Sequence, residues 1–248
     1  MKKYLSTAVS LGICALLWVT TSFALFFDFE DQDQLDQWEV LIPPNDPRND
    51  PDASWQIVNG ALELKSGGAW DFLALKDLEF ADGTIHYKLK WIEGGICEIG
   101  VFYRLEESPH LPHYHVHVSA INVPPTGVRW GYIEKVINGA KATGGSWRPT
   151  INRQIPGWGH APVDKWFEFK IEVRGDEHVV YAGREGRLKK AIELRHDERR
   201  SGRVGLVNYS GQDTVLIDDF EVILDPTIVA VERRGKLTTI WGKIKNDK

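Results

Sequence analysis

The sequence predicts an all-β protein, an antiparallel β-sandwich, on three observations. Short runs of residues alternate between apolar and polar side chains, and turn residues separate these runs along most of the chain. No long stretch between the runs has helical periodicity, whereas parallel strands need long crossover connections that usually contain a helix. Many short strands joined by turns are typical of an antiparallel sandwich or barrel.

Two segments carry the strand pattern most clearly. Residues 84–91 alternate cleanly between apolar and polar side chains, as expected of a strand with one buried face. Residues 55–64 predict two short strands around Asn59-Gly60, a dipeptide strongly favoured in two-residue hairpin turns. Further strands are expected at residues 96–104, 114–118, 128–137, 166–173, 178–182, 204–209 and 215–223.

Composition and charge narrow the class of protein. The chain has 248 residues, of which 42% are hydrophobic and 26% charged, values ordinary for a globular protein. The net charge is −5, and it becomes −7 if Lys2 and Lys3 are removed with an N-terminal segment. Because nucleic-acid binding requires a basic surface, we expect no nucleic-acid partner.

Residues 1–24 are predicted to be a signal peptide. Lys2 and Lys3 precede an apolar stretch, and Ser22-Phe23-Ala24 places small residues at the positions that signal peptidase inspects. The mature protein is therefore expected to be secreted, periplasmic or on the cell surface. The alternative is an uncleaved anchor, since the apolar stretch extends to Phe27 and approaches spanning length. Such an anchor is the only membrane contact that we expect.

The sandwich is expected to span residues 25–224. Residues 225–248 form a basic tail that could dock on an acidic surface, serve in sorting, or fray. Residues 139–164 contain Gly and Pro without a strand pattern, and a loop of that length is usually functional. Trp147 and Trp158 within it either contact a ligand or cover the sandwich edge.

Several strand-like segments, taken in order, resemble the concanavalin A-like lectin/glucanase superfamily over about residues 25–224. Within it, the sequence is similar to laminin-G-like domains and to the bacterial 3-keto-disaccharide hydrolase family. The resemblance implies a jelly-roll sandwich whose first and last strands are neighbours and whose concave sheet often binds glycans. The segments are Phe27-Asp28-Phe29-Glu30-Asp31 followed by Trp38, residues 83–89, 100–104, 166–171 and 202–206, and Leu216-Ile217-Asp218-Asp219-Phe220-Glu221-Val222.

Three histidines alternate in the predicted strand around residues 113–118. His113, His115 and His117 share one face at a spacing of about 6–7 Å, because alternate strand residues point the same way. Such a pattern can hold a metal ion, with Glu98 or Glu134 as a third ligand from another strand. The interpretation that we favour is a polar outer face that contacts solvent or a sugar.

A ligand-binding groove is predicted on the same face. Alternation places Arg104 on the polar face of its strand, and a neighbouring histidine strand would add His115 and His117, with Trp130 or Tyr132 beside them. Sugars bind by stacking on aromatic rings while charged groups bond their hydroxyls.

Catalysis is a weaker expectation. The resemblance implies paired carboxylates on one strand if the protein is a glucanase, spaced as Glu, then Asp two positions on, then Glu two or three positions further. The sequence lacks that spacing. A different catalytic set, made of Glu98, Arg104 and His115, remains a hypothesis.

The resemblance also implies a structural calcium ion near the first and last strands. Asp28, Glu30, Asp218 and Asp219 have the hard oxygen ligands that calcium prefers. The alternative is that they are ordinary edge carboxylates.

The function that we expect is an exported carbohydrate-binding module that recognises a glycan or polysaccharide on a concave sheet face. The alternatives are a glycoside-processing hydrolase of the 3-keto-disaccharide type and a structural or adhesive surface domain. The sequence alone leaves open whether the protein is an enzyme.

Overall fold

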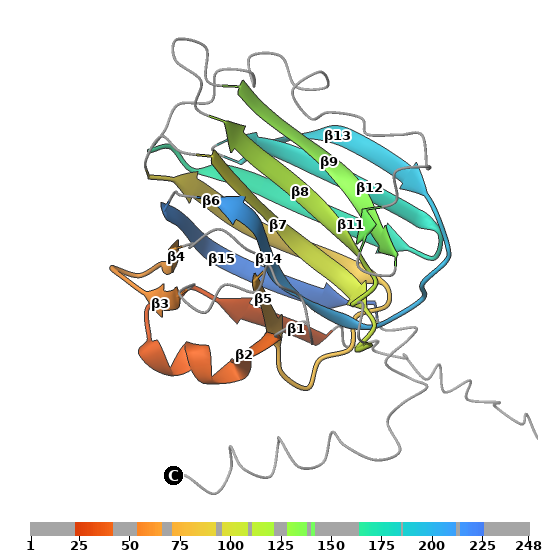
Figure 1. Cartoon of the computed structure of the whole chain (residues 1–248), viewed down its shortest axis with the longest axis horizontal. Helices are drawn as coiled ribbons and strands as arrows, with labels where there is room; N and C mark the ends of the chain where they lie inside the picture. Colours follow the sequence, from red (N-terminus) through yellow and green to blue (C-terminus); the bar gives the residue numbers. More distant parts are fainter. Residues whose placement is uncertain are drawn as a thin grey trace, which may run out of the picture.

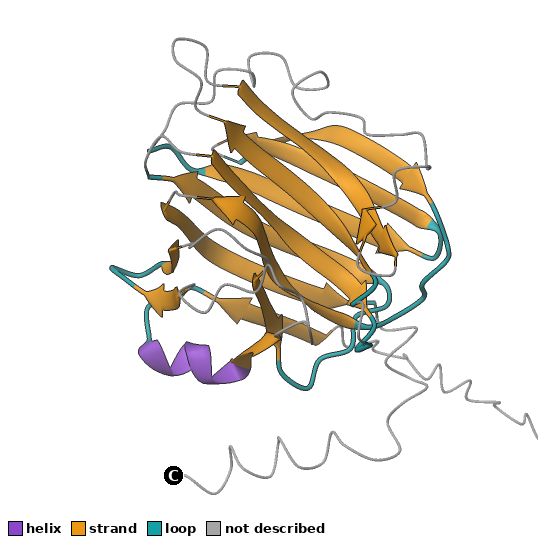
Figure 2. Cartoon of the chain, viewed as in Figure 1, coloured by secondary structure: helices purple, strands orange, loops and turns teal. Residues whose placement is uncertain are grey.

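Two antiparallel sheets pack face to face in the structure, which is a computed structural model (Figures 1 and 2). The only helix among the described residues is a 3-10 segment, η1 (Gln32–Gln37). The prediction of an all-β sandwich is therefore confirmed. The structure describes residues 23–41, 54–65, 71–92, 96–108, 111–121, 128–137, 140–141, 164–184, 186–211 and 214–225.

The first sheet has eight strands. Their order is β13-β12-β11-β6-β15-β4-β3, and β1 pairs with the end of β15. The strands are β1 (Phe23–Phe27), β3 (Ser54–Ile57), β4 (Leu62–Lys65), β6 (Gly83–Trp91), β11 (Phe167–Arg174), β12 (Glu177–Arg184), β13 (Arg187–Arg195) and β15 (Thr214–Leu224).

The second sheet has seven strands in the order β10-β9-β8-β7-β14-β5-β2. The expected histidine strand, β8, lies inside this sheet between β7 and β9. The strands are β2 (Trp38–Leu41), β5 (Asp71–Leu75), β7 (Ile96–Leu105), β8 (His113–Ile121), β9 (Val128–Ile137), β10 (Ala140–Lys141) and β14 (Arg203–Gly211).

The first and last strands are neighbours, as the resemblance implied. In the antiparallel pair β1–β15, Phe27 lies opposite Phe220, and their ring centroids are 6.5 Å apart. Phe29 and Trp38 pack beside them. A buried aromatic cluster therefore lies where the first and last strands pair.

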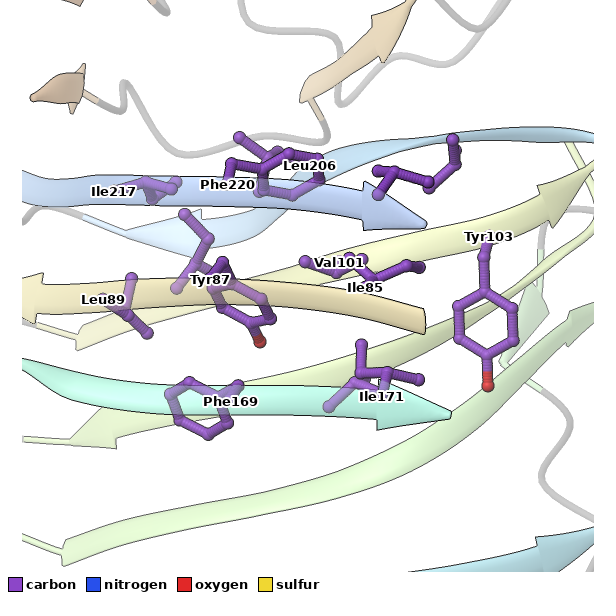
Figure 3. Close-up of a cluster of buried hydrophobic side chains, with 14 of the residues drawn as sticks. Ile85, Tyr87, Leu89, Val101, Tyr103, Phe169, Ile171, Leu206, Ile217 and Phe220 are labelled. Atoms are coloured by element: carbon purple, nitrogen blue, oxygen red, sulfur yellow. The ribbon is translucent and has the colours of Figure 1, made fainter. Parts of the chain in front are cut away.

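The core fills the space between the sheets. Along β6 the burial alternates as predicted, with Ile85, Tyr87, Leu89 and Trp91 buried. Figure 3 shows Ile85, Tyr87 and Leu89 of β6 beside side chains of the facing sheet, such as Val101. Residues that face away from this core form the two outer surfaces, and one of these surfaces holds the candidate site.

The Asn59-Gly60 hairpin is confirmed. Both residues have positive φ, 51° and 72°, as a two-residue hairpin turn of this type requires. Val58 and Ala61 exchange backbone hydrogen bonds of 2.8 and 3.2 Å, and β3 pairs with β4.

Other predictions lie outside the described residues. These are most of the predicted signal peptide (1–22), most of the long loop (142–163) and the tail 226–248. Phe23 and Ala24, the last two residues of the predicted signal peptide, pair with Leu224 and Ile223 in β1. Among the described residues, no helix combines the length and apolar character that crossing a bilayer requires.

Candidate ligand-binding face

The candidate site lies on the face of the seven-stranded sheet that points away from the core. The register sets its residues side by side: His115 of β8 lies opposite Phe102 of β7 on one side and Glu134 of β9 on the other. His117 lies opposite Gly100 and Tyr132 in the same way. The expected adjacency of the β7 strand and the histidine strand is therefore correct.

Alternation divides β8 as expected. Tyr114 and Val116 pack in the main core, whereas His113 and His115 lie on the outer face. Both histidines are nonetheless buried, with exposed fractions of 1% and 0%. They form the floor of the face rather than its solvent-contacting surface.

The floor is aromatic and apolar. Phe72 of β5 and Phe102 of β7 pack edge to face, with ring centroids 5.5 Å apart. His113 packs against both rings at 5.2 and 6.1 Å, and His115 lies 5.3 Å from His113. A second apolar cluster surrounds these rings and includes Ala74, Leu105, Leu111 and Val207.

A turn before β8 orients His113. Its Nδ1 lies 2.5 Å from the carbonyl oxygen of Leu111. A carbonyl can only accept a hydrogen bond, so Nδ1 carries the proton and donates it. Leu111 has a φ of 39°, an unusual value for a branched residue, and its amide bonds to Ser108.

Arg104 does not line this face, and the expectation of an outward guanidinium is wrong. It is fully buried, and its guanidinium donates to the backbone oxygens of Ala81, Arg199 and Gly175 at 2.7–2.9 Å. It also forms an ion pair with Asp82 at 2.8 Å.

A β-bulge explains the difference. Phe102 pairs with Gly205 and Leu105 pairs with Arg203, so two residues of β7 oppose one residue of β14. Arg104 has a φ of 52° within this bulge. Because the extra residue interrupts alternation, the Arg104 side chain leaves the sheet face and reaches the turns of the other sheet.

The sequence patterns did not predict a polar network inside the sandwich. His178 of β12 accepts a hydrogen bond from Tyr103 at 2.8 Å and donates to the His196 carbonyl at 2.9 Å. Tyr114 donates to Nδ1 of His196 at 2.6 Å. Burial, with Arg104 nearby, lowers the pKa of His178 from 6.5 to about 4. The only sequence signal was a histidine at a core-facing position of a strand.

The four carboxylates predicted as calcium ligands do not gather into one cluster. No three metal-ligating side chains gather among the residues that the structure describes, and all four predicted ligands are included there. Asp28 accepts a hydrogen bond from Gln34, and Asp219 forms an ion pair with Lys88 at 2.5 Å. Asp218 accepts from the Asp219 amide, while burial raises the pKa of Asp218.

The remaining candidate residues stay predictions. Glu98, His117, Trp130 and Tyr132 have described backbone positions, but their side chains are outside the description, and Trp147 and Trp158 are outside it altogether. The register places His117 and Tyr132 opposite each other, and Trp130 opposite Ser119.

The comparisons with known proteins agree with the fold. The model of the 3-keto-alpha-glucoside-1,2-lyase-like domain matches residues 24–221. No curated protein matches the chain.

Several solved structures share the architecture. The carbohydrate-binding module CBM66 of Bacillus subtilis is 17% identical, with a TM-score of 0.53 over 75% of this chain and 95% of its own. The β-glucanase of Bacillus licheniformis is 11% identical, with a TM-score of 0.54 over 82% and 98%. The exoplasmic/lumenal domain of VIP36, solved with Ca2+ and Man3GlcNAc, is 10% identical, with a TM-score of 0.54 over 77% and 84%. At these identities the likeness shows the fold, which is the predicted jelly roll.

Proposed function

Because the chain belongs to the family of 3-keto-alpha-glucoside-1,2-lyase-like domains, we propose that it is an exported carbohydrate-recognition domain. Its ligand is a glycan or polysaccharide, bound on the outer face of the seven-stranded sheet over β7, β8 and β9. The observation that carries this proposal is the aromatic and histidine floor formed by Phe72, Phe102, His113 and His115.

A rigid floor suits carbohydrate recognition. The packed rings hold the strands of this face in a fixed arrangement, which reduces the entropy lost when a ligand binds. The register puts His117, Trp130 and Tyr132 on that face, where aromatic rings can stack on the apolar side of a sugar. Proteins with this fold that are named for carbohydrate include CBM66 and the β-glucanase, which supports the ligand class.

A binding assay with a matched control tests the proposal. Glycan-array screening followed by calorimetry is expected to identify an oligosaccharide whose affinity falls at least about tenfold in Tyr132→Ala. Tyr181→Ala is the control, because Tyr181 lies on β12 in the other sheet, where Lys170 packs on its ring. Equal weakening by both variants, or no binding to any glycan, would contradict the proposal.

A second candidate function is the processing of 3-keto-glycosides, and the family match favours it. A ketone at C3 acidifies the proton on C2, because the resulting carbanion is an enolate. A base would remove that proton, the electron pair would form the C1–C2 double bond, and the C1–O bond would break. The departing oxygen takes up a proton, and water can then add across the double bond, which completes a net hydrolysis.

The candidate bases are Glu98 and His115, which lie on the adjacent strands β7 and β8. Arg104 is not part of this set, because its guanidinium is buried and bonded to backbone oxygens. In D2O, a 3-keto-disaccharide processed by elimination is expected to carry deuterium at C2 of the released sugar. Turnover without deuterium at C2, or turnover unchanged in both Glu98→Gln and His115→Gln, would rule this route out.

A further inference from the structure

We propose that the connection between β13 and β14 opens more readily in mild acid while both sheets stay folded, and that His178 is the group that triggers this opening. The connection, residues 196–202, crosses from the eight-stranded sheet to the seven-stranded sheet and is called the strap below (Figure 1). It is bonded to buried polar side chains inside the sandwich. Its opening is a response separate from ligand binding on the outer face.

Backbone hydrogen bonds hold the two ends of the strap. The His196 amide donates to the Asp176 carbonyl at 2.7 Å, and Gly202 exchanges two bonds with Phe80 at 2.7 and 3.1 Å. Between these ends, the side chains of Asp197, Glu198, Arg200 and Ser201 are exposed to solvent.

Buried side chains of the seven-stranded sheet hold the middle of the strap. The Arg199 amide donates to the Tyr114 hydroxyl at 3.3 Å, and the Arg104 guanidinium donates to the Arg199 carbonyl at 2.7 Å. Both side chains belong to residues that are at most 1% exposed. The attachment of the strap therefore depends on polar groups inside the sandwich.

His178 of β12 holds the start of the strap from inside. Its Nε2 donates to the His196 carbonyl at 2.9 Å, and its Nδ1 accepts a hydrogen bond from Tyr103 at 2.8 Å. Tyr114 packs on the His178 ring, with centroids 4.8 Å apart, and donates to Nδ1 of His196 at 2.6 Å. The strap is thus bonded directly to a buried network that contains an imidazole.

A second proton on His178 disturbs this network. Nδ1 becomes a donor, so the Tyr103 hydroxyl must turn its own proton away from it and into the core. The charged ring also lies close to the Arg104 guanidinium, which holds the Arg199 carbonyl of the strap. Opening the strap relieves both effects, because it admits water to the charged ring.

The groups around His178 do not offset this effect. Asp176 and the bond to the His196 carbonyl favour the charged ring, but burial and Arg104 oppose it more strongly. Burial raises the pKa of Tyr103 and of Tyr114, so both hydroxyls stay neutral. The charged and titratable groups that face His178 are Tyr103 and Arg104 of β7, Tyr114 of β8, His196 of the strap, and Asp176 of the turn before β12.

Hydrogen–deuterium exchange of the full-length protein at pH 7.5 and pH 5.0, read by mass spectrometry, tests the strap. After correction for the intrinsic exchange rate at each pH, the strap amides are expected to lose protection about thirtyfold at pH 5.0. That factor follows because the pKa of His178, about 4 in the closed chain, returns to 6.5 when the strap opens. The amides of β6, inside the eight-stranded sheet, should keep their protection.

Two variants assign the response. His178→Gln is expected to abolish the pH dependence of strap exchange, because glutamine does not titrate. His86→Gln is the matched control, since it removes an imidazole from the outer face of the same sheet, and it should keep the full wild-type response.

Equal protection of the strap at the two pH values overturns the proposal. Loss of protection by the strap and β6 together also overturns it, because that result is global unfolding, and so does an unchanged acid response in folded His178→Gln. If that variant does not fold by circular dichroism, His196→Gln decides between the two imidazoles. The proposal requires the acid response to persist in His196→Gln, and its loss there would assign the trigger to His196.

Discussion

At the scale of single residues, Arg104 joins parts of the chain that are far apart in sequence. Its guanidinium contacts Ala81 and Asp82 before β6, Gly175 between β11 and β12, and Arg199 before β14. The Asp82 carboxylate also accepts from the Gly175 amide at 2.9 Å. One buried cation therefore satisfies three carbonyls and one carboxylate where the turns of one sheet meet a strand of the other.

Arg104→Met is expected to destabilise the fold by about 3 kcal/mol or more. The substitution keeps most of the side-chain volume but leaves the carbonyls and Asp82 without their donor. Urea unfolding followed by tryptophan fluorescence measures the loss. Arg200→Met is the control, because Arg200 and Asp197 are both exposed and should contribute less than about 1 kcal/mol. Similar stabilities for the two variants would show that the buried contacts contribute little.

His178 makes stability depend on pH. Its pKa of about 4 in the folded chain lies below its ordinary value of 6.5, since burial and Arg104 disfavour the charged ring. Both ring nitrogens already bond as a neutral imidazole requires, Nδ1 to Tyr103 and Nε2 to the His196 carbonyl. The hydrogen bond to the His196 carbonyl and the charge of Asp176 favour the charged form of His178, whereas the His196 ring opposes it, and burial with Arg104 outweighs them.

The sign follows from proton binding. Above pH 6.5 the ring is neutral whether the chain is folded or not, so its contribution to stability is complete. Between pH 6.5 and 4 only the unfolded chain binds the proton, and stability falls by about 3 kcal/mol in total. Urea unfolding across this range is expected to show that loss in the wild type and a much flatter profile in His178→Gln. An equally steep profile in His178→Gln would assign the acid sensitivity to other groups.

At the scale of elements, the sequence predicted features that depend on neighbouring residues better than features that depend on residues far apart in the chain. The Asn59-Gly60 turn was predictable because its conformation depends on two adjacent residues. The bulge at Arg104 was not, because it arises from the pairing of β7 with β14, about a hundred residues away in sequence.

The strand β5 lacked alternation, since Phe72 and Ala74 are buried on its outer face as well as Leu73 and Leu75 on its inner face. In β13 the adjacent residues Ala191 and Ile192 are both buried at a bulge. The burial of two residues in succession interrupts the alternation by which a strand is predicted.

A substitution of Gly205 in β14, which lies close to Phe102, tests how tightly β14 packs against β5. A Cβ at Gly205 would clash with the Leu73 carbonyl oxygen and lie 2.9 Å from the Phe102 ring. Gly205→Ala is therefore expected to cost about 2 kcal/mol, measured by chemical denaturation. Gly186→Ala is the comparison, because Gly186 has a φ of 73° but no atom within 4 Å of its Cβ position. A smaller cost at Gly205 than at Gly186 would mean that β5 and β14 separate easily.

At the scale of the whole molecule, the two outer surfaces differ in chemistry. The eight-stranded sheet presents charged side chains to solvent, with ion pairs such as Lys88–Asp219 and Lys170–Glu172. The seven-stranded sheet carries the buried aromatic and histidine floor on its outer side. Alternation correctly predicted that β8 divides its residues between the core and this floor. It could not predict the burial of His113 and His115, since that depends on contacts from beyond their own strand.

The pairing of β1 with β15 has a consequence for the order in which the chain folds. Phe27 finds its partner only at Phe220, and β6 lies between β11 and β15, both of which come late in the sequence. A chain emerging from the ribosome with its N-terminus first therefore waits for its last strand before this sheet can close. Pairings so distant in sequence slow folding and leave strand edges exposed meanwhile. During synthesis β7, β8 and β9 of the other sheet are better placed to pair early, because they are consecutive neighbours, whereas β5 and β2 join that sheet only through the late strand β14.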